Sequence, residues 1–300
     1  MSTASNPAQP PRGGVIHDLG FRHYDGPRAG SRAIAQALYF DTLRGAFGLG
    51  RTMKSKIMPA VLFVAMVFPA IVITIVVGVD NRFDLPVDYN EYLLTTSALT
   101  SLFIAGAAPA SVSRDLRFRV VALYFSRPLQ RVEYVLAKYS ALASALFLMM
   151  AIPLIVMYTG ALLAKLSVGS QTPNFTRALG GAAVTALLVA GIAVTIAAMT
   201  PRRGVGVAAI IVSLIVLAGV GGTVSEVGLE NGARSTAAYG QLISPYTLAH
   251  GVEHSVFGGP SQADIPPPGA GGGLVFTLVA LAVVTACLAL LMARYRKVSI

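Results

Sequence analysis

The sequence predicts an all-α integral membrane protein with six transmembrane helices. Of its 300 residues, 55% are hydrophobic and 12% are charged, about half the charged fraction of a typical soluble domain. The apolar residues gather in six segments that contain no Asp, Glu, Lys or Arg. Each segment exceeds about 20 residues, the length that a helix needs to cross a bilayer. One soluble core could not hold them all.

The six predicted spans form a transmembrane domain over residues 57–293. The second span is rich in Ser, Thr, Ala and Gly, so we expect it to pack among other helices rather than to face lipid. Only residues 200–204 separate the fourth span from the fifth, which makes these two helices antiparallel neighbours. In chain order the spans are Ile57–Val79, Tyr92–Val112, Tyr139–Leu163, Ala178–Met199, Val205–Ser225 and Gly273–Ala293.

Two segments precede the first span. Residues 1–30 form a polar arm, and we expect its Pro-, Ser- and Gly-rich beginning to be disordered. Residues 31–56 carry apolar side chains at near-helical spacing among Arg and Lys, which predicts an amphipathic helix in the inner headgroup region. A solvated linker that is only partly helical is the alternative. The arm also contains a dense polar stretch: His17, Asp18, Arg22, His23, Tyr24, Asp25 and Arg28.

The distribution of basic residues orients the chain. Cytoplasmic connections retain an excess of Lys and Arg, and here these residues gather before the first span, in the second and fourth connections, and in the tail at residues 294–300. We therefore predict that both termini are cytoplasmic. The prevalence of Arg, Ala, Gly and Val favours a bacterial source, and hence a bacterial plasma membrane. The other three connections hold eight of the thirteen acids and only four basic residues, Arg82, Lys165, Arg177 and Arg234.

Several function classes are disfavoured. The net charge of +10 is spread between apolar spans rather than gathered on a soluble face, which argues against nucleic acid. The chain has no GxxxxGK[ST], GxSxG, HExxH or CxxC motif, and its one cysteine, Cys287, lies in the last span. The spans lack Asp, Glu, His and Lys, which disfavours an ion-coupled carrier or an intramembrane protease. His250 and His254 have i,i+4 spacing, but without an evident third ligand we expect no metal site.

The connection between the second and third spans, residues 113–138, carries the most informative pattern. Four apolar side chains recur at helical spacing, and a Ser-Arg-Pro sequence ends the predicted helix. A short cytoplasmic helix with Arg and aromatic side chains suits docking in a groove of a soluble partner. An interfacial helix that binds only anionic lipid is the alternative. The apolar positions are Leu116, Val120, Leu123 and Tyr124, followed by Ser126-Arg127-Pro128.

This connection resembles the region between the second and third helices of ABC-2 type transporter permeases. The likeness rests on Ser-Arg-Asp at residues 113–115, Ser-Arg-Pro-Leu-x-Arg at residues 126–131, and Lys138 at the next span. In that family the segment is a coupling helix that inserts into a separate ATP-binding subunit. This chain has Arg-Phe-Arg-Val at residues 117–120, where the family often has Glu followed by Gly-Thr. The resemblance implies ATPase-coupling roles for Arg114, Asp115, Arg117, Phe118, Arg119, Tyr124, Arg127, Pro128 and Arg131.

The same resemblance implies a permease subunit without an ATPase site of its own. Its partners would be a second permease copy or a related permease, and an ATP-binding subunit that holds ATP and Mg. Ser-Pro-Tyr at residues 244–246 is a weaker match and implies short outer helices before the sixth span. We expect export of a hydrophobic or amphipathic small molecule, because the spans carry no charge to fix a polar cargo. A scaffold or mechanotransmitter driven by the same ATPase is the main alternative, and an ATP-independent carrier is a weaker one.

Overall fold

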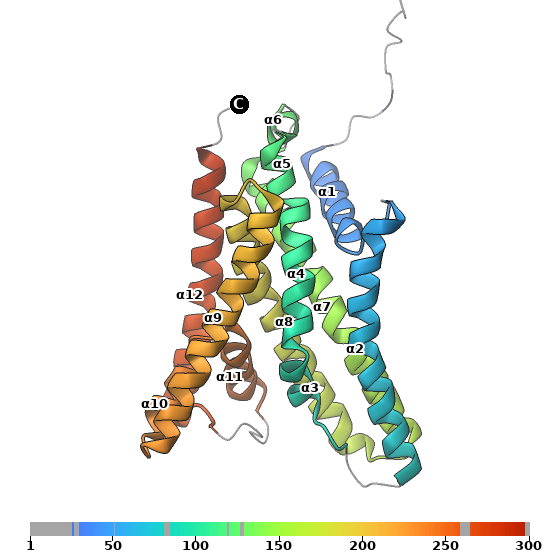
Figure 1. Ribbon diagram of the computed structural model, residues 1–300, viewed down its shortest axis with the longest axis vertical. Helices are drawn as coiled ribbons and strands as arrows, with labels where there is room; N and C mark the ends of the chain where they lie inside the picture. The colour runs from blue at the N-terminus through green and yellow to red at the C-terminus, as the bar shows by residue number, and fades with distance from the viewer. Residues whose placement is uncertain are drawn as a thin grey trace, which may run out of the picture.

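The computed structural model describes residues 26, 30–50, 52–80, 85–118, 120–126, 129–258 and 265–297. Within these residues every regular element is an α-helix. Five helices are long and apolar enough to cross a membrane, and α3 with α4 is a sixth if this pair, bent by 55°, forms one span. The chain is thus a multi-pass helical membrane protein by length and composition. The helices (Figure 1) are α1 (Ser31–Ala46), α2 (Met53–Asp80), α3 (Tyr89–Thr95), α4 (Ser97–Ser111), α5 (Ser113–Arg117), α6 (Val120–Phe125), α7 (Arg131–Leu163), α8 (Val168–Met199), α9 (Arg203–Glu230), α10 (Arg234–Gly240), α11 (Pro245–Phe257) and α12 (Gly269–Arg296).

Five of the predicted spans lie within single helices, and the second lies mostly within the α3–α4 pair. Two helices begin well before the predicted apolar boundary: α7 begins at Arg131 rather than Tyr139, and α8 begins at Val168 rather than Ala178. The early start of α7 has a local cause. The side chain of Glu133 accepts a hydrogen bond from the backbone N–H of Gln130 at 2.9 Å, one half of a capping box.

Helix α1 is shorter than the amphipathic helix predicted over residues 31–56. It ends at Ala46, and the chain turns through Gly48 and Gly50, whose φ angles of 70° and 79° favour glycine. Its apolar face packs on the bundle, where Leu38 is buried. The hydroxyl of Tyr39 donates to Ser144 Oγ of α7 at 2.9 Å. Helix α1 is therefore attached along one face to α7 and α4, at one end of the bundle (Figure 1).

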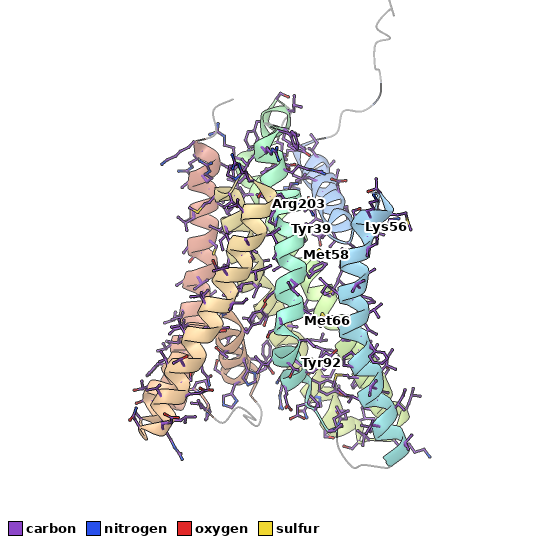
Figure 2. All side chains as sticks on the ribbon, viewed as in Figure 1. Tyr39, Lys56, Met58, Met66, Tyr92 and Arg203 are labelled. Atoms are coloured by element: carbon purple, nitrogen blue, oxygen red, sulfur yellow. The ribbon has the colours of Figure 1, made fainter. Side chains whose placement is uncertain are left out.

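The second predicted span bends at Thr96, between α3 and α4. The Thr96 hydroxyl donates to the carbonyl of Tyr92 at 2.8 Å, a local bond that often accompanies a bend in a helix. The hydroxyl of Tyr92 in turn donates to the carbonyl of Met66 on α2, and Figure 2 shows these two residues at neighbouring levels of the bundle. Pro69 cannot donate to the carbonyl of Ala65, so α2 is irregular next to this contact.

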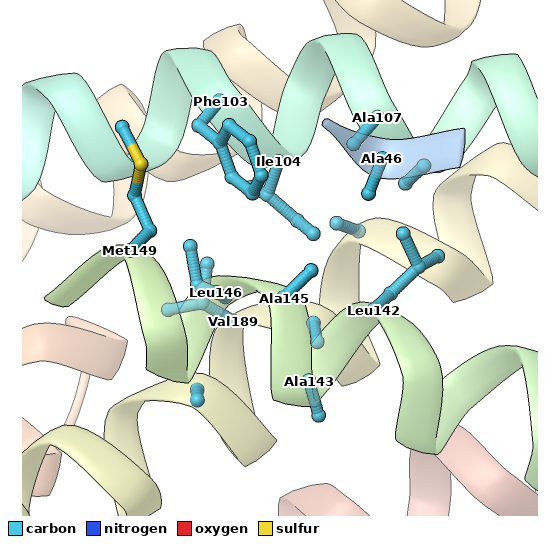
Figure 3. Close-up of a cluster of buried hydrophobic side chains, with 14 of the residues drawn as sticks. Ala46, Phe103, Ile104, Ala107, Leu142, Ala143, Ala145, Leu146, Met149 and Val189 are labelled. Atoms are coloured by element: carbon cyan, nitrogen blue, oxygen red, sulfur yellow. The ribbon is translucent and has the colours of Figure 1, made fainter. Parts of the chain in front are cut away.

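Helices α4, α7 and α8 form the interior. In α8, 67% of the most apolar stretch is buried, against 17% in α2, so α2 faces outward and α8 does not. Every residue of α4 from Phe103 to Ser111 is buried, as the composition of the second span predicted. Figure 3 shows Phe103 of α4 beside Leu146 and Met149 of α7. Many of the remaining buried positions in these helices are Ala, which lets the helix backbones approach closely.

Two short helices, α10 and α11, lie between α9 and α12 in the chain, at the end of the bundle away from α5 and α6 (Figure 1). Ser244 precedes α11 and Pro245 is its first residue, a position where proline loses no helical hydrogen bond. Gly251 of α11 packs against Phe276 of α12, which is fully buried. A Cβ atom at residue 251 would overlap the Phe276 ring. Helix α11 is thus seated closely on α12.

The close approach of α11 to α12 yields a stability prediction. We expect Gly251→Ala to lower the free energy of unfolding by about 2 kcal/mol, because the added methyl group overpacks the contact with Phe276. Gly219→Ala is the matched control, since nothing lies within 4 Å of that site on α9. Thermal unfolding of the purified protein in detergent measures both. Equal stability of the two variants would contradict the close packing of α11 on α12.

Candidate functional site

The α5–α6 segment, residues 113–126, follows α4 at the end of the bundle nearest α1 (Figure 1). Two short helices replace the single helix predicted here. The first ends at Phe118, whose N–H donates to the carbonyl of Arg114 at 3.1 Å. The predicted apolar face holds only in part. Leu116 and Tyr124 pack on the core, whereas Leu123 is 67% exposed.

A buried ion pair joins the α5–α6 segment to α7. Asp115 Oδ2 lies 2.9 Å from Lys138 Nζ, and the two side chains are only 9% and 7% exposed. The hydroxyl of Tyr134 donates to the same Asp115 oxygen at 3.0 Å. Lys138 also donates to the carbonyl of Ser111 at 3.2 Å. These added hydrogen bonds matter because a buried ion pair is tolerated only when its remaining polar atoms also have partners.

An aromatic cluster surrounds the ion pair. The ring of Tyr134, on α7, lies 5.6 Å from Tyr124 and 5.9 Å from Phe125, both on α6, and 5.2 Å from Tyr295 on α12. Tyr134 and Tyr295 are buried. Aromatic pairs at such separations stabilise beyond the area that they bury. Helix α6 is therefore held against α7, and the same tyrosine joins α7 to α12.

Polar contacts extend the same attachment to α8. Ser113 Oγ donates to the carbonyl of Ala197 at 2.8 Å, and Arg294 Nε donates to the carbonyl of Ala198 at 3.3 Å. Arg131 lies over the ring of Phe125 at 5.6 Å and donates to the carbonyl of Arg296 at 3.4 Å. The base of the α5–α6 segment is thus tied to α7, α8 and α12 together.

The outer surface of the segment presents basic and apolar side chains. Arg114, Arg117, Phe118 and Leu123 are all exposed. The guanidinium of Arg117 lies 5.7 Å from the centre of the Phe118 ring, within the range of a cation–π contact. Exposed Arg and aromatic side chains are typical anchors of protein interfaces. The predicted residues Arg119, Arg127 and Pro128 lie outside the described residues.

The structure divides the predicted coupling residues into two groups. Arg114, Arg117 and Phe118 face outward, whereas Asp115 is buried and has an internal partner, so it is not part of the exposed surface. The sequence pattern predicted Lys138 as a family match but did not pair it with Asp115. The sequence did contain a signal for this pair. Asp115 follows the second span and Lys138 precedes the third, so the two opposite charges lie at the same end of two consecutive spans.

A second polar cluster lies at the other end of the bundle. Glu253 of α11 is 4% exposed, accepts a hydrogen bond from Asn90 Nδ2 at 2.6 Å, and lies 3.6 Å from His250 Nδ1. The sequence placed Glu253 in a polar connection and gave no indication of its burial. His254 lies on the same helix, but among the described residues no three or more His, Cys, Asp or Glu side chains group as metal ligands would.

Comparison of the sequence with protein-family models gives no match, and comparison with curated proteins gives none either.

The buried ion pair predicts a distinctive mutational pattern. Lys138→Met should lower the free energy of unfolding by about 3 kcal/mol, because it leaves the Asp115 carboxylate buried without its counter-charge. Adding Asp115→Asn should restore more than about half of this loss, since the amide removes the unpaired charge and still accepts from Tyr134. Thermal unfolding of the single and double variants in detergent tests the pattern. No recovery in the double variant would mean that charge pairing does not hold α5 on α7.

Proposed function

We propose that this chain is the membrane-spanning permease subunit of an ABC-2 type transporter in a bacterial plasma membrane. A separate ATP-binding subunit would supply ATP and Mg and dock on the α5–α6 segment. A second permease copy, or a related permease, would complete the transport pathway. The cargo would be a hydrophobic or amphipathic small molecule that leaves the cytoplasm or the inner leaflet.

The observation that carries this proposal is the combination of an exposed surface with a rigid base in the α5–α6 segment. Arg114, Arg117 and Phe118 are available to a soluble partner. Asp115 is bound to Lys138 directly behind them. A displacement of the exposed side chains would therefore be transmitted to α7, because the ion pair connects the segment to that helix directly. Such a rigid connection is what a motor subunit requires to move a transmembrane helix.

The arrangement of the helix ends supports the proposed orientation. Helix α1, the α5–α6 segment, the start of α9 at Arg203 and the end of α12 lie at one end of the bundle (Figures 1 and 2). These are the regions where the sequence concentrates Lys and Arg. Because cytoplasmic flanks retain basic residues, we assign this end to the cytoplasm.

Cysteine labelling tests the assignment of sides. In a Cys287→Ala background we expect Ser170→Cys to react with a membrane-impermeant maleimide on intact cells stripped of any outer envelope. Ser126→Cys should react only after the membrane is opened. The two serines are both exposed and lie in connections predicted to face opposite sides. Labelling of Ser126→Cys on intact cells would mean that the predicted orientation is wrong.

The main alternative is a mechanotransmitter or scaffold that uses the same ATPase but moves nothing through the membrane. Vesicles containing this chain and its proposed ATP-binding subunit separate the two functions. A transporter accumulates cargo inside inverted vesicles when ATP is added, and the cargo stimulates ATP hydrolysis. A mechanotransmitter hydrolyses ATP without accumulation.

The docking surface yields a direct prediction. We expect the double variant Arg117→Glu/Phe118→Ala to weaken association with the ATP-binding subunit at least about tenfold, because it removes an aromatic anchor and reverses an exposed charge. Co-purification from co-expressing cells, together with ATP-driven transport in vesicles, measures the effect. Membrane insertion and thermal stability should be unchanged, because both residues are exposed.

Arg202→Glu provides the matched control for charge. This arginine is also exposed and lies in the connection between α8 and α9, at the same end of the bundle. We expect it to alter association less than about threefold, as charges at the rim of an interface commonly do. Docking on the α5–α6 segment would be disproved if Arg202→Glu weakened association with the ATP-binding subunit as much as the double variant does. Full ATP-driven transport in the double variant would disprove it as well.

A further inference from the structure

A cavity of about 310 Å³ opens between the end of α1 and the turn after it, the start of α2, the second half of α4 and the start of α9. Its volume reaches the lower limit of about 300 Å³ for small-molecule sites. It lies apart from the α5–α6 segment, and no residue of that segment lines it. The lining residues are Gly45, Ala46, Thr52, Lys54, Ser55, Met58, Pro59, Phe103, Gly106, Ala107, Ala110 and Arg203.

The polar part of the cavity is basic. Lys54, near the start of α2, and Arg203, the first residue of α9, line it from two different helices, and Thr52 and Ser55 are further lining residues with hydroxyl groups. Among the described residues, the lining contains no Asp or Glu, and neither cation has an ion-pair partner. Two cations and two hydroxyls without a carboxylate are suited to a phosphate or carboxylate group.

The rest of the lining is apolar and continues toward the middle of the bundle. Met58 lies one helical turn beyond Lys54 on α2, and Phe103 lies about 10 Å along α4 from Ala110 at 1.5 Å per residue. The start of α9 packs beside the Ala110 end, where a Cβ atom on Gly206 would lie 3.2 Å from Pro109. Figure 2 shows Arg203 near the α1 end and Met58 farther along the bundle. The cavity is thus charged at one end and apolar at the other.

We propose that this cavity binds a lipid-like anion, with its phosphate or carboxylate headgroup between Lys54 and Arg203 and its chain along Met58 and Phe103. Basic pockets between helices at the cytoplasmic side of a membrane are suited to anionic headgroups. The apolar chain enters from the leaflet that surrounds α1 and α2. Binding requires no ATP-binding subunit, so this proposal goes beyond the transport function, and it rests only on the proposed cytoplasmic side of this end of the bundle.

Native mass spectrometry of the full-length protein in detergent tests the proposal, with phosphatidylglycerol as the probe. The variant Lys54→Gln/Arg203→Gln should bind the lipid at least about tenfold more weakly, since each cation near an anionic headgroup contributes about 1 kcal/mol. Lys56→Gln/Arg202→Gln is the matched control. It removes the same two charges from neighbouring positions that do not line the cavity, and we expect less than a twofold change.

A third variant tests the apolar part without altering charge. Ala110→Leu adds volume to the lining, so it should also weaken phosphatidylglycerol binding at least about fivefold. Lys54 and Arg203 are exposed, so their replacement should leave the fold intact, and thermal unfolding checks this for every variant. If the two double variants lost equal affinity for phosphatidylglycerol, the lipid would be attracted diffusely to the basic surface. That result would overturn the proposed site.

Two further probes identify the part of the lipid that is recognised. Phosphatidylcholine carries the chains without a net negative charge, and glycerol phosphate carries the anion without chains. We expect phosphatidylcholine to bind at least about tenfold more weakly than phosphatidylglycerol, and glycerol phosphate to compete only weakly. Competition by glycerol phosphate at the same concentration as the lipid would identify a free-phosphate site and would overturn the lipid assignment. Tight binding of phosphatidylcholine would overturn the role of Lys54 and Arg203.

Discussion

The ion pair between Asp115 and Lys138 is the contact on which the basic end of the bundle depends. Two charges with so little access to water are stable only while they remain together, because separation leaves each of them buried and unpaired. The pair therefore fixes the position of α5 relative to α7. The aromatic contacts of Tyr134 and the bond from Ser113 to α8 can then form around it. The exposed arginines project from this fixed base.

The interior of the spans obeys a different physical rule. Lipid is as apolar as a leucine side chain, so the hydrophobic effect does not drive helices together within the bilayer, and close backbone contact takes its place. The abundant buried alanines of α4, α7 and α8 allow this contact. Single hydrogen bonds, such as Tyr39 to Ser144 and Tyr92 to Met66, then attach the more peripheral α1 and α2 to the interior.

Hydropathy was sufficient to locate five helices that are long and apolar enough to cross a membrane, because uncharged segments of this length have few alternatives in water or in lipid. The second predicted span lies mostly in the bent α3–α4 pair. The small-residue composition of the second span also correctly predicted the burial of its second half, from Phe103 to Ser111. Periodicity does not record the bend at Thr96, where the side-chain hydroxyl bonds to the carbonyl of Tyr92, or the end of α5 at Arg117. Burial of Asp115 and Glu253 depends on which helices meet, which the sequence pattern does not record.

The bend at Thr96 has a mechanical consequence. A helix transmits rotation along its axis only while its backbone hydrogen bonds are continuous, and α3 and α4 are separate rods joined at an angle of 55°. Rod α4 continues into α5, whereas rod α3 touches α11 through Asn90 and Glu253. The joint at Thr96 therefore lets the two rods tilt relative to each other. A single unbroken helix at this position would make α5 and the contact with α11 move together.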